Sequence, residues 1–268
     1  MIHKAVAFIK KDFLIESSYK FAFVTRFLGV IITILGYFFI DRLFGSKMTP
    51  HLEAFGVTYF PYVLLSNAFF GYVGVGLSSF SQRISNEQVD GTLEAVLVTP
   101  TKITTMLVSM TLWNLIMATI DIAVYVAAGI FIFGIDFSNC NILSAMVIFL
   151  ITILSFSGLG ILSASFIIVF KRGNPIGWLI GGLEGLIGGV YFPITVLPGW
   201  LQLISYCFPI TYAIRAIELA VYKGYGLDRL SFEIGMLIML SIIILPLSFI
   251  SFSRALRKAR IEGTLSQY

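Results

Sequence analysis

Charged side chains are scarce in this sequence. Asp, Glu, Lys and Arg make up 12% of its 268 residues, whereas a soluble domain has about 25%. Hydrophobic residues make up 58%. This composition excludes an ordinary soluble domain and indicates an integral membrane protein.

Cysteine and histidine are also rare. The two cysteines, Cys140 and Cys207, are too few for a disulfide framework. The two histidines, His3 and His51, are far apart, so we expect no metal site. The net charge of +4 does not call for nucleic acid as a partner. No G-x-x-x-x-G-K-S/T loop occurs, so we do not expect ATP to bind this chain.

Long apolar runs fill most of the chain, and a membrane-crossing helix needs about 20 apolar residues. The sequence therefore predicts an all-α membrane protein with six transmembrane helices. The third run is unusually long, so we expect that helix to be tilted. The six expected spans cover residues 21–40, 58–80, 103–133, 142–170, 176–192 and 234–253.

Residues 3–20 carry Val6, Ile9 and Phe13 at helical spacing, with lysines between them. This pattern favours an amphipathic interfacial helix whose lysines meet anionic headgroups. A frayed cytoplasmic tail is the alternative, since short helices are marginal alone. The same charges argue against a cleavable signal peptide.

Proline breaks the chain before the last span, at Pro193, Pro198 and Pro209. The apolar pieces between and after them, 199–208 and 210–222, are too short to cross the hydrocarbon. They predict a re-entrant helical hairpin within residues 193–224. Such broken backbone is tolerated at membrane depth only where protein or a wet cavity covers it.

A polar stretch, residues 81–102, interrupts the first half of the chain. Ser85 and Gln88 have the spacing of a capping box, which predicts a helix starting near Asn86, and Pro100 ends it. This short helix, over residues 85–99, either joins two spans as a solvated loop or docks on a partner. Its apolar residues recur on one helical face: Val89, Leu93, Val96 and Leu97.

Two carboxylates, Asp121 and Glu184, fall inside predicted spans. Because a charge is costly in lipid, each should face protein or water. Each could line a substrate path, pair with another helix, or serve packing alone. Arg215 and Glu218 are three residues apart and could pair, although a surface ion pair is worth little. Glu184 lies beside a face of small residues that favours close helix packing: Gly177, Gly181, Gly185 and Gly189.

The positions of Lys and Arg predict the orientation. With both termini inside, only five of the 18 basic residues lie outside: Arg42, Lys47, Arg215, Lys223 and Arg229. Because cytoplasmic loops carry the excess of Lys and Arg, we expect a multi-pass protein of the cell membrane with both termini cytoplasmic. Cys140 and Cys207 would then both lie outside, where a disulfide between them is left open.

Two segments resemble one known family. The stretch from Asn86 to Glu94, running on to Pro100, resembles the cytoplasmic loop helix of the membrane subunits of type-2 ABC exporters. The stretch Tyr191–Arg215, with its three prolines, resembles their re-entrant extracellular segment. The likeness covers nearly the whole chain, and Gln88 departs from it, since members often have a basic residue there.

The resemblance implies an exporter permease with no catalysis or cofactor of its own. A second permease copy, identical or not, would complete a path for an amphipathic substrate: a drug-like molecule, a lipid or a lipid-linked glycan. A separate ABC ATPase subunit would bind ATP and Mg and dock on the coupling helix, residues 85–99. That interface would comprise Glu87, Gln88, Val89, Asp90, Gly91, Leu93, Glu94, Val96 and Leu97. The residues proposed for the path or for helix packing are Asp121, Gly181, Glu184 and Gly185.

Two other classes of function compete with the exporter: an intramembrane enzyme and an ion-coupled carrier. An intramembrane enzyme acting on lipid or glycan needs acid, base or metal ligands that converge in one pocket. Asp90 and Glu94 are expected in the cytosol, and Asp121 and Glu184 lie in different spans, which does not favour such a site. An ion-coupled carrier is built from inverted repeats, and no internal repeat is obvious here.

Overall fold

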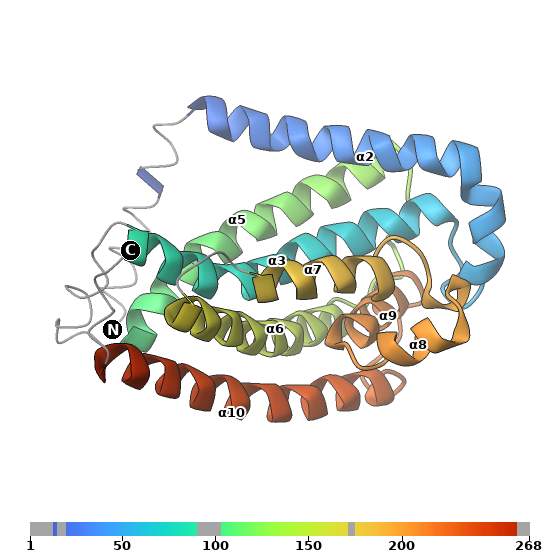
Figure 1. Ribbon diagram of the computed structural model, residues 1–268. Coiled ribbons are helices and arrows are strands. Elements are labelled where there is room, and N and C mark those ends of the chain that lie inside the picture. Colours follow the sequence, from blue (N-terminus) through green and yellow to red (C-terminus); the bar gives the residue numbers. More distant parts are fainter. Residues whose placement is uncertain (1–12, 15–19, 90–102, 171–174, 262–268) are drawn as a thin grey trace.

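The computed structural model describes residues 13–14, 20–89, 103–170 and 175–261. In this part of the chain the ordered elements are eight α-helices and two short 3-10 helices, and none is a strand (Figure 1). The all-α prediction is therefore confirmed for the described residues. The predicted interfacial helix at 3–20 and the stretch 90–102 lie almost wholly outside them.

Five helices of 29 to 31 residues form the body of the protein. At 1.5 Å per residue each is about 45 Å long, which exceeds the hydrocarbon thickness. Each contains a stretch long and apolar enough to cross a membrane. The five are α2 (Lys20–Met48), α3 (Tyr59–Val89), α5 (Ile103–Phe131), α6 (Ile142–Phe170) and α10 (Ser231–Ile261).

The helix in the region of the predicted fifth span is shorter than expected. α7 (Pro175–Ile187) has 13 residues, or about 20 Å, and is too short to cross the hydrocarbon alone. The chain turns after it, with Gly189 at a φ of +93° that favours glycine. By length the described part has five candidate spans, and a sixth only if a bent helix pair counts as one.

That bent pair is α8 (Gly199–Ser205) and α9 (Pro209–Tyr222), which meet at 89°. They follow η2 (Ile194–Val196) and match the two short helices predicted after the prolines. The Thr211 hydroxyl of α9 donates a 2.7 Å hydrogen bond to the Ser205 carbonyl of α8, which links the two helices. α9 is buried almost throughout, and a re-entrant segment would need such cover by the rest of the protein.

The helix ends define two ends of the bundle. One end of the bundle holds α8, α9 and η1 (Thr49–Leu52), and it is called the hairpin end here (Figure 1). The opposite end of the bundle holds the start of α2 and the ends of α3, α6 and α10 (Figure 1). It is called the basic end here, because the last turns of α10 carry Arg254, Arg257 and Lys258.

The core is built on α3 and α6. α6 packs along α10 on one side and along α3 on the other, and α3 also packs along α5. α3 and α6 approach closely at Gly160, where an added Cβ would lie 2.6 Å from the Gly76 carbonyl oxygen. α2 lies at the edge, with Leu43 72% exposed.

One predicted helix start is wrong. α3 continues without a break through Ser85 to Val89, so no new helix is capped near Asn86. Ser and Gln three residues apart can occur inside a continuous helix as well as at the start of one, so this spacing alone does not locate a helix start.

Candidate functional site

The first third of α3 carries two adjacent polar residues, Ser66 and Asn67. Neighbouring side chains on a helix point about 100° apart, so the two face different helices. The Ser66 hydroxyl donates a 2.7 Å hydrogen bond to Oε1 of Glu218 on α9. The Asn67 amide accepts a bond from Tyr37 on α2 at 3.0 Å and donates one to Tyr125 on α5 at 3.1 Å. Side-chain hydrogen bonds therefore join α3 to three helices.

Glu218 is fully buried, and its second carboxyl oxygen has no hydrogen-bond partner among the described residues. Two tyrosines add hydrogen bonds that tie α3 to α9 and to the turn after α7. The Tyr222 hydroxyl donates to the Pro61 carbonyl at 2.8 Å, and the Tyr62 hydroxyl donates to the Gly189 carbonyl. Burial of an incompletely bonded polar group costs free energy, so packing alone does not explain a carboxyl at this position.

Arg215, one turn before Glu218 on α9, does not pair with it. Its Nε lies 3.1 Å from Oε1 of Glu233, in the first turn of α10. Arg215 is exposed, whereas every other residue of α9 is buried. The local pairing considered from the sequence is therefore wrong, because the two side chains point to different surroundings.

Glu184 on α7 is also fully buried, and neither carboxyl oxygen has a hydrogen-bond partner among the described residues. It lies on the same side of the helix as Gly181 and Gly185. A Cβ on Gly181 would lie 3.6 Å from Leu77, and one on Gly185 would lie 3.5 Å from Phe70. Both neighbours belong to α3, so this face of α7 packs on α3.

The predicted row of four glycines is not continuous. α7 ends at Ile187, so Gly177, Gly181 and Gly185 are helical but Gly189 lies in the turn that follows. The close contact here is at Gly188 instead, where a Cβ would collide with the Ile210 side chain of α9. Helical spacing could not show where the helix stops.

Asp121 of α5 forms an ion pair with Arg26 of α2. Arg26 Nε lies 3.0 Å from Oδ1, and Arg26 Nη2 lies 2.6 Å from Oδ2. A guanidinium with two bonds to one carboxylate is a strong and directional contact. Among the roles left open for Asp121, the structure shows a charge pair with another helix.

A cavity of about 220 Å³ lies at the hairpin end. Tyr62, one helical turn before Ser66, forms part of its wall, so the cavity lies close to the hydrogen bond between Ser66 and Glu218. Its mixed walls suit an amphipathic molecule better than a simple ion. The aromatic and polar side chains that line it are His51, Phe55, Tyr62, Thr195, Tyr206, Thr211 and Arg215.

The described part of the chain shows neither a metal cluster nor a disulfide. Within it, no three His, Cys, Asp or Glu residues could hold a metal ion together. Cys140 and Cys207 are both free, so the disulfide left open by the sequence is not formed.

The predicted ATPase interface is only partly described. Glu87, Gln88 and Val89 form the end of α3. The remaining predicted interface residues lie outside the described residues: Asp90, Gly91, Leu93, Glu94, Val96 and Leu97.

Comparison with protein families identifies the class of protein. A model of the ABC-2 type transporter family matches residues 6–222, which takes in α2 to α9. The chain belongs to this family. It is a membrane permease of an ABC transporter, as the loop and hairpin motifs predicted. A comparison with curated proteins found no match.

Glu218 and Ser66 of the permease were not among the predicted site residues. The signal for Glu218 was available: a lone carboxylate within an apolar run of a membrane protein marks a functional position by default. Ser66 offered no such signal, because small polar residues are common where membrane helices pack. Its partner is 152 positions away in sequence.

Proposed function

We propose that this permease is the membrane subunit of an ATP-driven exporter of amphipathic molecules. The observation that carries the proposal is the family match over residues 6–222. A separate ATPase subunit supplies the energy and holds ATP and Mg. The permease has no catalytic role in this account.

The ATPase docks on residues 85–99. The loop motif supports this assignment, because the apolar positions Val89, Leu93, Val96 and Leu97 need a cover where the chain leaves the membrane. A soluble domain with a groove provides such a cover for an amphipathic helix. Since α3 runs unbroken to Val89, movement at this interface would pass directly into the helix that carries Ser66 and Asn67.

A second permease copy completes the path. The long apolar face that α2 exposes supports this. On it, the side chain of Ile32 is 67% exposed and that of Phe39 is 62% exposed. Leu183 and Leu186 of α7 are exposed too, on the side of that helix away from its contacts with α3. The partner is a second copy of this chain, with a different permease chain as the alternative.

The cargo is a drug-like molecule, a lipid or a lipid-linked glycan. The cavity at the hairpin end supports this class because it combines tyrosines with hydroxyl and cationic side chains. Aromatic faces accept apolar or sugar surfaces, and a few placed polar groups orient the ligand. Glu184 and Glu218 supply buried carboxyl oxygens that have no hydrogen-bond partner among the described residues.

The basic end faces the cytoplasm, in keeping with the excess of Lys and Arg there. Asn139 is exposed in the loop between α5 and α6. In a background without native cysteines, an impermeant thiol reagent on intact cells should label Asn139→Cys and not Gln82→Cys. Labelling of Gln82→Cys would reverse the orientation.

Reconstitution tests the function as a whole. The permease is purified with the ATPase that accompanies it and placed in vesicles with fluorescent amphipathic probes. We expect probe movement that needs ATP and stops in an ATPase variant unable to hydrolyse it. Turnover or movement by the permease alone, at the same rate without ATPase, would contradict the proposal.

A further inference from the structure

The short helix α8 exposes one apolar face at the hairpin end of the bundle. Trp200, Leu203 and Ile204 are three and four residues apart, so they lie on the same side of the helix. The side chain of Trp200 is 64% exposed and that of Leu203 is 71% exposed, and Ile204 is exposed as well. These three side chains are called the α8 face below.

The other side of α8 is held by the protein. The Gln202 side chain donates a 2.8 Å hydrogen bond to the Leu197 carbonyl, and Ser205 is buried. Where the helix ends, the Tyr206 carbonyl accepts a 3.0 Å bond from the Tyr212 hydroxyl of α9. The polar side chains of α8 therefore turn to the protein, and the α8 face has a fixed direction.

An apolar surface leads from the end of α8 to α10. The ring centroids of Tyr206 and Tyr212 are 6.4 Å apart, and those of Tyr212 and Phe232 are 6.2 Å apart. Phe232 lies in the first turn of α10 and is exposed. α10 is a candidate span that goes on to expose Ile242 and Leu247, as a helix in contact with lipid does. The same lipid can therefore reach α8.

The helix ends at the hairpin end show how far lipid extends there. α5 ends at Phe131 and α6 begins at Ile142, and both side chains are exposed. Apolar side chains this exposed gain free energy when lipid covers them. Trp and Tyr are enriched at the level where hydrocarbon meets the headgroups. α8 lies at this end of the bundle and carries Trp200 (Figure 1).

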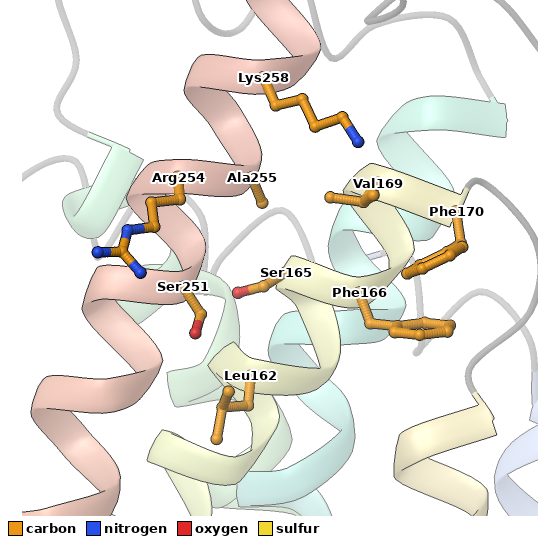
Figure 2. A pocket seen from close by; sticks show the side chains of 9 residues that line it. All are labelled: Leu162, Ser165, Phe166, Val169, Phe170, Ser251, Arg254, Ala255 and Lys258. Atoms are coloured by element: carbon orange, nitrogen blue, oxygen red, sulfur yellow. The ribbon is translucent and has the colours of Figure 1, made fainter.

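The two ends of the bundle differ in the charges that accompany their apolar side chains. At the basic end, Arg254 and Lys258 of α10 line one groove with Phe166 and Phe170 of α6 (Figure 2). At the hairpin end, residues 185–214 contain no charged side chain. A face that meets water usually carries charge, whereas a tryptophan beside leucine and isoleucine suits the boundary of the hydrocarbon.

A second copy of the chain is a poorer cover for the α8 face than lipid. α8 has seven residues and is about 10 Å long, whereas a stable protein interface takes about 20–30 residues on each side. Tyrosine and phenylalanine rings connect α8 to α10, and α10 and α2 lie on opposite sides of the bundle (Figure 1).

We propose that the α8 face inserts into the lipid leaflet at the hairpin end. Trp200 lies where the headgroups meet the acyl chains, and Leu203 and Ile204 contact the upper part of those chains. Because Tyr206 also lines the cavity at this end, lipid contact steadies one wall of that cavity. The proposal does not depend on the cargo, on the ATPase or on which side of the membrane the hairpin end faces.

Tryptophan fluorescence of the full-length permease in phosphatidylcholine vesicles tests this. Trp113→Phe/Trp178→Phe leaves Trp200 as the single tryptophan of the chain. Three quenchers are compared: lipid brominated near the headgroup end of its acyl chains, lipid brominated near the chain ends, and iodide in the water. We expect the shallow bromine to remove most of the Trp200 emission, the deep bromine to remove less, and iodide to remove little.

Trp200→Phe/Ser138→Trp in the same background is the matched control, because Ser138 is exposed in the polar loop between α5 and α6. Its tryptophan should be quenched mainly by iodide. Leu203→Asp, which keeps Trp200, should shift the Trp200 emission to longer wavelength and raise its quenching by iodide. The difference in quenching between the parent and Trp200→Phe gives the Trp200 signal without removal of the other tryptophans.

Three results would overturn the proposal. Strong quenching of Trp200 by iodide would place the α8 face in water. Resistance to all three quenchers would mean that protein covers the face, as a second copy would. Strongest quenching by the deep bromine would place it within the hydrocarbon and not at its boundary.

Discussion

Ser66 and Glu218 form a buried hydrogen bond of 2.7 Å that joins α3 to α9. The bond lies next to Tyr62, whose ring also lines the cavity at the hairpin end. It connects the long helix that reaches the predicted ATPase interface to the short helix that closes the hairpin end. A change in the position of α3 must therefore move α9 or break this bond.

Removal of the Ser66 hydroxyl should destabilise the permease. Ser66→Ala leaves a fully buried carboxyl without this bond, and an unsatisfied buried group costs about 1–3 kcal/mol. We expect a lower midpoint of thermal unfolding in detergent. Thr119→Val is the control, because Thr119 is exposed and its hydroxyl bonds to the Leu115 carbonyl of its own helix. Equal losses in the two variants would show that the Glu218 bond is not what matters.

The close approach of α3 and α6 should not tolerate a methyl group. A Cβ on Gly160 would lie 2.6 Å and 2.8 Å from the carbonyl oxygens of Gly76 and Leu77. Backbone cannot swing aside as a side chain can, so Gly160→Ala should cost about 1–3 kcal/mol of stability. Gly71→Ala, which has open space around its Cβ on α3, should be neutral or slightly stabilising. Thermal unfolding of the two variants compares them directly.

The ion pair between Arg26 and Asp121 should show coupling. Asp121→Asn leaves an arginine without its carboxylate, and Arg26→Gln leaves a carboxylate without its guanidinium. Removal of one partner costs more than removal of both. We expect the double variant to be more stable than the sum of the single effects predicts, in a double-mutant cycle on thermal unfolding. Strict additivity would mean that the pair contributes nothing.

Glu184 should matter for transport more than for assembly. Glu184→Gln keeps the size of the side chain in its buried site, so the permease should fold and assemble. Transport rate or cargo preference should change, since the carboxyl is the unbonded polar group on that face of α7. Gly185→Leu is the contrasting variant and should destabilise the fold, and with it lower assembly, because Tyr191 and Phe70 of the same chain lie against it. A Glu184→Gln permease that transports every probe like the parent would reduce Glu184 to a packing element.

The sequence was most informative where lipid alone sets the structure. Hydrocarbon thickness fixes how long an apolar run must be, so residues 142–170 were predicted with the bounds that α6 has. Helix ends beyond the hydrocarbon were not predicted, because α2 and α3 continue into polar residues that a hydropathy pattern does not separate from a loop. α2, for example, runs to Met48 and not to residue 40.

The site was less predictable for a different reason. Asp121 and Glu184 could be singled out because a carboxylate in lipid is costly wherever it occurs. Their partners could not, since Arg26 and Asp121 are 95 residues apart and only the folded bundle brings them together. Local spacing even pointed to the wrong partner for Arg215, because α9 turns it to the surface and Glu218 to the interior.

The central claim is that a separate ATPase drives this permease through residues 85–99. Co-purification of the ATPase with Leu93→Arg, beside Glu94→Ala and Gly91→Ala, tests it most directly, with insertion checked in the membrane fraction. Burial of a leucine is worth roughly 1.5–3 kcal/mol, and an arginine would add an unpaired charge. We expect that Leu93→Arg inserts normally but loses the ATPase, while Glu94→Ala and Gly91→Ala keep most of it. Normal co-purification and normal transport by Leu93→Arg would contradict the assignment.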